Sequence, residues 1–297
     1  MNDQPPSLPR RLLRLGSRNG SGPAKRGREL SQHPPACEDG SDRAPADAFA
    51  GASPRRLARI AGALYLINIV GGAFAIGLVQ TMLLTPDPAA TAHNIQTHEL
   101  LYRAGLAAHI VVTVTNVPLA LIFYELFKMV NRRLALLDAF FILVATAIEA
   151  ASLVNQFTPL ILLNSETYAN ALPTAQLHAL ASLPGALSQG SYDIYTVFFG
   201  LDILCLAYLV LRSRFLPRTI AVLLAIDGLA YLIYSFAQIL TPGFAAHLVP
   251  WIQLPAPLGE GALSLWLLLR GVNTQHWTAT ADTPPLRGPS QQVQALK

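Results

Sequence analysis

Residues 198–233 read FFGLDILCLAYLVLRSRFLPRTIAVLLAIDGLAYLI. Two apolar runs flank the basic turn RSRFLPR, and each is close to the ~20 residues that a bilayer-spanning helix needs. Pro217 suits the start of the second helix, because the N–H that proline lacks has no partner in the first turn. This segment therefore predicts two membrane helices joined by a basic turn.

Similar apolar runs occur along most of the chain. The six segments long enough to span a bilayer are 57–84, 104–127, 134–163, 190–211, 217–240 and 250–270. The last is interrupted by Pro250, Pro255 and Pro257, which favours a broken or partly re-entrant start. We predict an all-α integral membrane protein, a bundle of six transmembrane helices with a disordered N-terminal tail.

The composition excludes the common soluble classes. Hydrophobic residues make up 52% of the chain and charged residues 13%, about half of the roughly 25% that soluble proteins carry. A soluble enzyme and a nucleic-acid-binding domain are therefore excluded. A disulfide-rich module is excluded too, because Cys37 lies in a polar tail and Cys205 in an apolar run.

The basic residues predict the orientation of the spans. Residues 1–59 hold 11 of the 21 Lys and Arg, and the six-span arrangement puts 20 of the 21 on one side, leaving Arg103 on the other. By the positive-inside rule both termini are cytoplasmic. The arginines of the two inner turns set orientation in this interpretation, with binding of an anionic lipid headgroup as the alternative: Arg132, Arg133, Arg212, Arg214 and Arg218.

Three regions follow from this pattern. Residues 1–54 are rich in Pro, Gly, Ser and charge and predict a disordered cytoplasmic tail. Residues 55–270 form the six-span membrane domain, and 271–297 a disordered cytoplasmic C-terminal tail. The external segment 165–190 predicts a short amphipathic helix on the outer surface, ended by Pro184 and Gly185.

Four stretches carry a family resemblance. They are 198–233, RLARIAGALYLINIVGGAF (56–74), ATAHNIQTHELLYRAGLAAHI (90–110) and YELFKMVNRRLALL (124–137). Over roughly residues 55–270 the chain resembles DUF4386, a family of polytopic bacterial membrane proteins. The resemblance implies location in the bacterial inner membrane, and it implies no reaction. The chain differs from the family pattern at Asp202 and Asp227, where His or an apolar residue is expected.

No enzyme motif stands out. The chain contains no G-x-S-x-G elbow, no P-loop and no G-x-G-x-x-G. Asp193 and Asp202 are nine residues apart on one expected helix and point to opposite sides, so they cannot form an aspartyl protease pair. His93 and His98 are poorly spaced for a metal. We therefore expect no catalytic residues, no metal and no cofactor. An enzyme that acts on lipid or quinone is the least favoured functional hypothesis.

Polar residues lie in stripes on three expected helices. Each stripe occupies one helical face: His109, Thr113 and Asn116; Asp138, Glu149, Ser152 and Gln156; Asp227, Tyr231, Tyr234 and Gln238. These faces should point into the bundle, where interhelical hydrogen bonds contribute about 0.6–2 kcal/mol each.

Five polar residues lie within two positions of the span midpoints, or about 3 Å of depth: Asn116, Glu149, Asp202, Asp227 and Glu260. No Lys or Arg lies mid-span to neutralise the four acids. Acidic residues at this depth are rare and usually functional, and burial favours their uncharged form unless a cation binds. We predict a buried polar site from these residues, with Asn116 and Tyr231 as hydrogen-bonding partners.

Two functions are consistent with this site. The first is a small transporter that responds to protons or a small cation. The alternative is a non-transporting membrane sensor or assembly module, in which the polar residues only bridge helices. A water-accessible cavity at the carboxyls would favour the first, and closed hydrogen-bonded pairs the second. The expected partners are the lipid bilayer and protons or a small cation, with no nucleic acid.

Overall fold

The computed structural model describes residues 53–275 and 277, which form helices and no strand. The long helices are α1 (Pro54–Gly72), α4 (Glu99–Asn155), α7 (Thr174–Ser213), α8 (Arg218–Leu240) and α10 (Pro255–Leu269). The shorter elements are the π-helical η2 (Ala73–Gln80), α2 (Thr81–Leu83), α3 (Pro88–Thr97), α5 (Thr158–Leu163), α6 (Glu166–Ala171), α9 (Pro242–Leu248) and the 3-10 turn η3 (Trp251–Gln253). The predicted all-α class is confirmed for this part of the chain.

Five helical stretches of the described residues are long and apolar enough to cross a membrane. They are Pro54–Leu83, Glu99–Leu163, Thr174–Ser213, Arg218–Leu240 and Trp251–Leu269. Large apolar side chains lie exposed on these helices, among them Val114, Phe140 and Leu229. Such a surface requires lipid around it, since exposed apolar patches of this extent are unfavourable in water. The protein is an integral membrane protein.

Helix α4 is a hairpin of two arms. Asn131 interrupts it with φ −156° and ψ 102°, and its side chain accepts a backbone N–H at the start of the helix that follows. His109 Nε2 lies 2.8 Å from Glu149 Oε1, although the two residues are 40 positions apart. This contact requires two antiparallel arms, a first arm of residues 99–130 and a second arm of residues 132–155.

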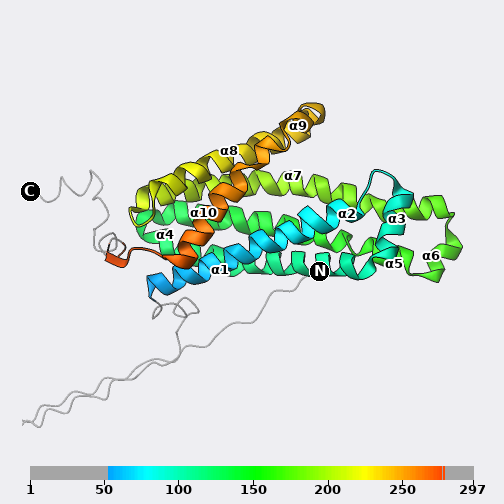
Figure 1. Ribbon diagram of the computed structural model, residues 1–297, viewed down its shortest axis with the longest axis horizontal. Coiled ribbons are helices and arrows are strands. Elements are labelled where there is room, and N and C mark those ends of the chain that lie inside the picture. Colours follow the sequence, from blue (N-terminus) through cyan, green and yellow to red (C-terminus); the bar gives the residue numbers. More distant parts are fainter. Residues whose placement is uncertain (1–52, 276, 278–297) are drawn as a thin grey trace, which may run out of the picture. The chain divides into compact units, whose positions relative to one another are not determined.

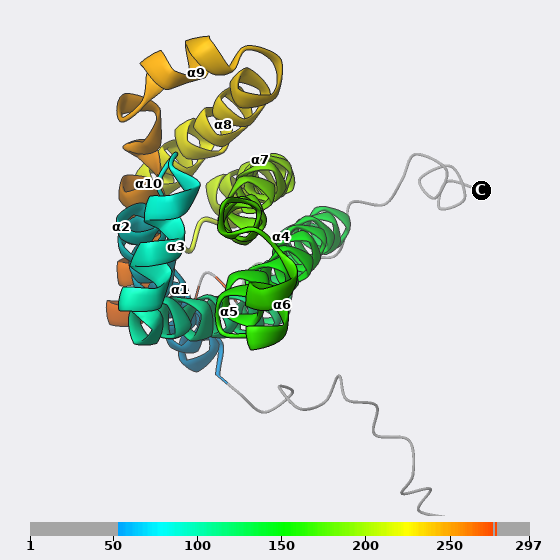
Figure 2. The ribbon, with the colours of Figure 1, turned by 90° about the vertical axis from the view of Figure 1, so that its right-hand side faces the viewer.

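The long helices form a ring in chain order (Figures 1 and 2). Helix α1 joins the first arm through a hydrogen bond from Asn68 Nδ2 to Thr115 Oγ1 (3.1 Å). The second arm joins α7 through Ser152 and Ser188, whose hydroxyls are 3.1 Å apart. Helix α7 packs on α8, α8 on α10, and α10 returns to α1. The ring brings helices from both ends of the chain around one interior.

Small residues allow the closest crossings in this ring. A Cβ on Gly62 of α1 would lie 2.4 Å from the backbone nitrogen of Leu268 in α10, and Ser264 donates a hydrogen bond to the Gly62 carbonyl (3.0 Å). A Cβ on Gly228 of α8 would lie 2.9 Å from the Gly200 carbonyl oxygen in α7. Backbones this close need glycine, as is common between membrane helices.

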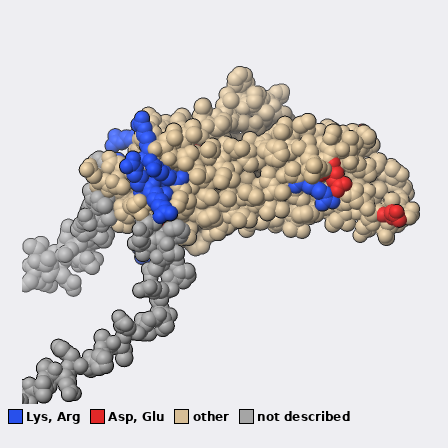
Figure 3. Space-filling model, turned by 60° about the horizontal axis from the view of Figure 1, so that its bottom comes forward, with Lys and Arg blue, Asp and Glu red and all other residues tan. Residues whose placement is uncertain are grey.

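Basic residues gather at one end of the bundle, which we call the basic end (Figure 3). It comprises the start of α1, the turn between the arms of α4, the α7–α8 turn and the end of α10. Its members are Arg55, Arg56, Arg59, Lys128, Arg132, Arg133, Arg212, Arg214, Arg218 and Arg270. In the described residues only Arg103 lies elsewhere among the Lys and Arg, at the start of α4 beside Glu99 (2.6 Å).

The interior of the basic end is filled by an apolar layer. Phe127 is 1% exposed, and its ring stacks on Phe215 (centroids 5.6 Å apart) and meets Phe123 edge-on (6.2 Å). Aliphatic side chains from α1, α7 and α10 complete the layer: Leu57, Ala58, Leu209, Val210 and Leu267. The layer closes the ring on this side.

Helix α7 corrects one prediction. The expected surface helix does not end at Pro184 and Gly185, because α7 runs unbroken from Thr174 to Ser213. An internal proline costs a helix about 3 kcal/mol, and contacts of α7 with α3 and α5 offset this cost. At 40 residues the helix is about 60 Å long, which exceeds the ~30 Å hydrocarbon core and carries its first turns beyond it.

Part of the expected C-terminal tail packs against the helices, whereas nearly all of the expected N-terminal tail lies outside the described residues. Residues 1–52, nearly all of the expected N-terminal tail, lie outside the described residues, as do 276 and 278–297. Val272 is buried and the Trp277 indole donates to the Leu126 carbonyl (3.2 Å), although we expected the C-terminal tail to begin at residue 271. Between α8 and α10 the chain is divided into α9 and η3, in line with the expected broken start of the last span.

Candidate functional site

A cavity of about 1100 Å³ lies inside the ring of helices. Its lining begins at Phe123 and Leu206, next to the apolar layer of the basic end. It continues to Pro86, Gln189 and Gln253, which are exposed. The cavity is therefore closed toward the basic end and reaches the surface away from it.

All of the residues predicted to form a buried polar site line this one cavity: Asn116, Glu149, Asp202, Asp227, Tyr231 and Glu260. They come from both arms of α4 and from α7, α8 and α10. Each of the four carboxyl-bearing residues is less than one tenth exposed. The helical repeat explains the convergence, because residues spaced three or four apart on each helix share the face that points into the ring.

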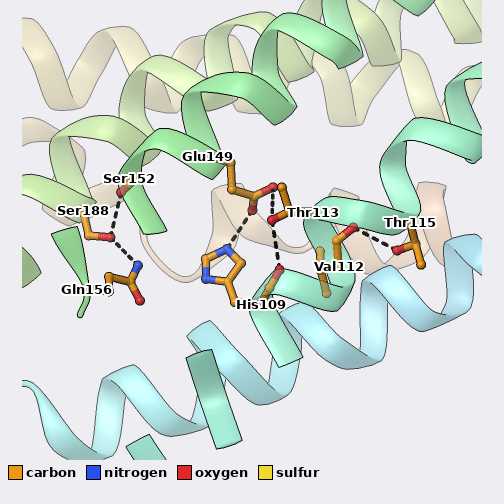
Figure 4. Close-up of polar contacts among 8 residues, drawn as sticks. All are labelled: His109, Val112, Thr113, Thr115, Glu149, Ser152, Gln156 and Ser188. Atoms are coloured by element: carbon orange, nitrogen blue, oxygen red, sulfur yellow. Dashed lines mark hydrogen bonds and ion pairs between the residues drawn. The ribbon is translucent and has the colours of Figure 1, made fainter. Parts of the chain in front are cut away.

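Glu149 is held by the facing arm of α4 (Figure 4). Its Oε1 lies 2.8 Å from His109 Nε2, and its Oε2 accepts a hydrogen bond from Thr113 Oγ1 (3.3 Å). Farther along the same pair of arms, Gln156 donates to Ser188 Oγ (2.8 Å). These bonds tie the two arms and α7 together along one wall of the cavity.

Asp227 and Glu260 form a second acidic group, between α8 and α10. Tyr231 donates a hydrogen bond to Glu260 Oε1 (2.9 Å). The side chains of Asp227 and Tyr65 also interact with Glu260. Two buried carboxyls that lie close together repel each other when both are ionised, so a proton or a cation between them stabilises the pair.

Asp202 has an acidic neighbour as well. Its carboxyl interacts with Asp138 of the second arm, which is 2% exposed. The same chemistry applies here as at Asp227 and Glu260, because one proton can be shared between two adjacent carboxyls. The cavity thus borders two carboxyl pairs.

Some buried polar atoms of the described residues lack a hydrogen-bond partner. They are Asn68 Oδ1, His109 Nδ1, Asp138 Oδ1 and Asp227 Oδ2. Three of the four residues line the cavity: Asn68, His109 and Asp227. A buried polar atom without a partner costs about 1–3 kcal/mol, so each of these atoms lowers the stability of the packing around the site.

Three residues that interact with the predicted site residues were absent from the predicted set. His109 and Asp138 belong to the polar stripes, but the sequence did not show that they face Glu149 and Asp202. Tyr65 does not belong to a polar stripe, so the sequence around it gave no sign that it lies at the site. Each of the three residues reaches the site because its helix packs against another helix, and the sequence does not show which helices pack together.

Acidic residues dominate the ionisable side chains that line the cavity. Among the described lining residues there are four acids and one histidine, and none is Lys or Arg. No group of three or more His, Cys, Asp or Glu side chains within the described ranges is arranged to hold a metal ion. The arrangement therefore favours a positively charged or hydrogen-bond-donating ligand held by oxygen atoms.

Comparison with known proteins identifies the family. A family model described as "Domain of unknown function (DUF4386)" matches residues 60–271, which is more than half of the chain. The chain belongs to this family, and the resemblance seen in the sequence is confirmed. No curated protein and no solved structure matches the chain.

Proposed function

We propose that this member of the DUF4386 family is a small transporter of the bacterial inner membrane that responds to protons or a small cation. The observation that carries the proposal is the cavity, which is lined by Glu149, Asp202, Asp227 and Glu260, borders the apolar layer of the basic end and reaches exposed residues away from it. A transporter that works by alternating access exposes its binding cavity to one side of the membrane in each state.

The proposed topology has six passes with both termini in the cytoplasm. The hairpin at Asn131 divides the longest apolar stretch into two arms, and each is longer than the ~20 residues that a span needs. The two arms turn five candidate stretches into six passes. The basic end then faces the cytoplasm under the positive-inside rule, and the cavity faces outward.

The acidic pairs supply a means of responding to protons or cations. Asp227 with Glu260 and Asp202 with Asp138 are buried neighbours. If two such carboxyls share one proton, its loss leaves a repulsion that a bound cation relieves, so proton release and cation uptake are chemically linked at such a pair. This linkage is the simplest basis for coupled movement across the membrane.

The alternative role, a sensor or assembly module, draws on the bridging hydrogen bonds. The contacts of Glu149 with His109 and of Thr196 with Ser235 (2.6 Å) fit helix bridging alone. A bridging role does not account for a cavity of about 1100 Å³ at the carboxyls. The transporter is therefore the function that the geometry supports better.

Cysteine labelling tests the topology. With Cys37 and Cys205 replaced by serine, Tyr168→Cys in α6 and Arg132→Cys in the α4 turn each place a thiol at an exposed position. We expect a membrane-impermeant maleimide added to whole spheroplasts to label Tyr168→Cys, and to label Arg132→Cys only after permeabilisation. Labelling of both variants in intact spheroplasts would contradict the six-pass arrangement.

Thermal stability tests the response to protons and cations. A cation that binds only the folded protein stabilises it, by about 2.7 kcal/mol at a concentration of 100 times its Kd. We expect the melting temperature of the purified protein to depend on pH between about 5 and 9 and to rise with an added monovalent or divalent cation. Single changes of Glu149, Asp202, Asp227 and Glu260 to the corresponding amides should reduce both responses in at least one variant.

Glu166→Gln is the matched control for these variants. Glu166 is an exposed acid of α6 and does not line the cavity, so its change should leave both responses intact. A wild-type protein whose melting temperature follows neither pH nor cations, together with amide variants of unchanged stability, would rule out the proposed function.

A further inference from the structure

The size of the cavity indicates an organic ligand. Pockets for small molecules typically measure about 300–1000 Å³, and this cavity measures about 1100 Å³. A bare proton or metal ion needs a small fraction of that space. The volume therefore suits a molecule with an apolar body in addition to its polar group.

One wall of the cavity is a row of aromatic rings. Tyr192, Tyr195 and Phe199 follow each other along α7 with centroids 5.8 and 5.4 Å apart, and Phe199 meets Tyr231 of α8 at 5.3 Å. All four rings line the cavity. The three rings of α7 stack on one another, with planes 24° and 15° apart, and a further aromatic group can add to such a row by offset or edge-to-face contact.

This row ends at the second acidic group. Tyr231 is the last ring and donates a hydrogen bond from its hydroxyl to Glu260. Asp227, the acidic neighbour of Glu260, is 1% exposed and also lines the cavity. A buried acceptor gains most from a charged donor, because charge-assisted hydrogen bonds are about twice as strong as neutral ones.

The charges of the lining residues further restrict the class of ligand that can bind. The described lining contains four acidic residues and no Lys or Arg to pair with an anion. An acidic ligand of the same shape would meet repulsion from the carboxyls, whereas an ammonium group would donate hydrogen bonds to them.

From these observations we infer that the cavity binds a protonated amine attached to an aromatic body. The ammonium group donates to Asp227 and Glu260, and the aromatic body lies along the rings of Tyr192, Tyr195 and Phe199. The inference rests on the proposed function of the same cavity and names the class of molecule that it takes.

The test uses three probes that share an indole ring and differ at the end of the side chain. Tryptamine ends in an ammonium, 3-ethylindole in a methyl group and indole-3-propionate in a carboxylate. Binding to the full chain in detergent is measured by isothermal titration calorimetry at neutral pH. We expect tryptamine to bind with a Kd at least about tenfold lower than that of 3-ethylindole, and no detectable binding of indole-3-propionate.

Substitutions of lining residues test whether tryptamine binds in this cavity. Asp227→Asn should raise the Kd of tryptamine at least about tenfold, because the charge that pairs with the ammonium is lost. Tyr195→Leu should also weaken binding, whereas Tyr195→Phe, which keeps the ring, should not. Tyr208→Leu and Glu166→Gln are the controls, since Tyr208 is an exposed tyrosine of the same helix α7 and neither residue lines the cavity.

The outcomes separate the inference from the proposed function. Equal affinity of the three probes for a wild-type protein whose melting temperature still responds to pH and cations would overturn the inference and leave the proposed function standing. Loss of both responses and of probe binding would remove both. Preference for tryptamine that survives in Asp227→Asn and in Tyr195→Leu would place the binding outside this cavity and overturn the inference.

Discussion

Phe127→Ala should lower the free energy of unfolding by about 3 kcal/mol, within the range known for truncating a core phenylalanine. The ring is 1% exposed and packs between Phe123 and Phe215 in the apolar layer of the basic end. The helices around the ring can relax only partly, so the change would leave a cavity in the layer. Chemical or thermal unfolding of the purified protein in detergent measures the loss.

Phe140→Ala is the matched control. Phe140 lies on the second arm of the same hairpin and is 57% exposed, so lipid or detergent replaces its contacts and its loss should cost far less. Equal destabilisation by the two changes would show that Phe127 is not packed more tightly than a lipid-facing side chain, contrary to its contacts.

His109→Leu should lower the free energy of unfolding by about 3 kcal/mol, because it leaves a buried carboxyl without its main partner. Glu149 is 9% exposed, and without His109 it keeps the hydroxyl of Thr113 at 3.3 Å as a hydrogen-bond donor. The cost arises from the group left unpaired, more than from the bond itself.

A double-mutant cycle separates these two contributions. Changing both His109 and Glu149 to leucine removes the pair together, so the double variant should be more stable than His109→Leu alone. Losses that simply add in the double variant would show that the two side chains do not interact in the folded protein.

Much of the fold follows from hydropathy and charge. The apolar segments and the RSRFLPR turn predict the long helices, and α8 begins after Pro217, the first residue of the fifth predicted segment. The basic residues of the inner turns predict a common basic end. These features are local, because lipid requires each spanning segment to satisfy its own backbone hydrogen bonds as a helix.

The start of α7 shows where local signals mislead. Pro184 and Gly185 are strong stop signals in a sequence, yet the helix continues through both, since α3 and α5 pack against it. A similar limit applies to Asp138, which lies in a predicted polar stripe but whose neighbour Asp202 is 64 positions away in the sequence.

The sequence by itself determined that this protein lies in a membrane, that its long apolar segments are helices and that polar residues share single faces of them, because each of these depends on the order of apolar and polar residues along one helix. Only the tertiary structure decided that Glu149 faces His109, that Asp227 lies near Glu260 and that these groups border one cavity. The physical reason is that spacing along a helix fixes which residues share a face. Which faces meet depends on how closely the backbones approach, at positions such as Gly62 and Gly228, and on how neighbouring helices close into a ring.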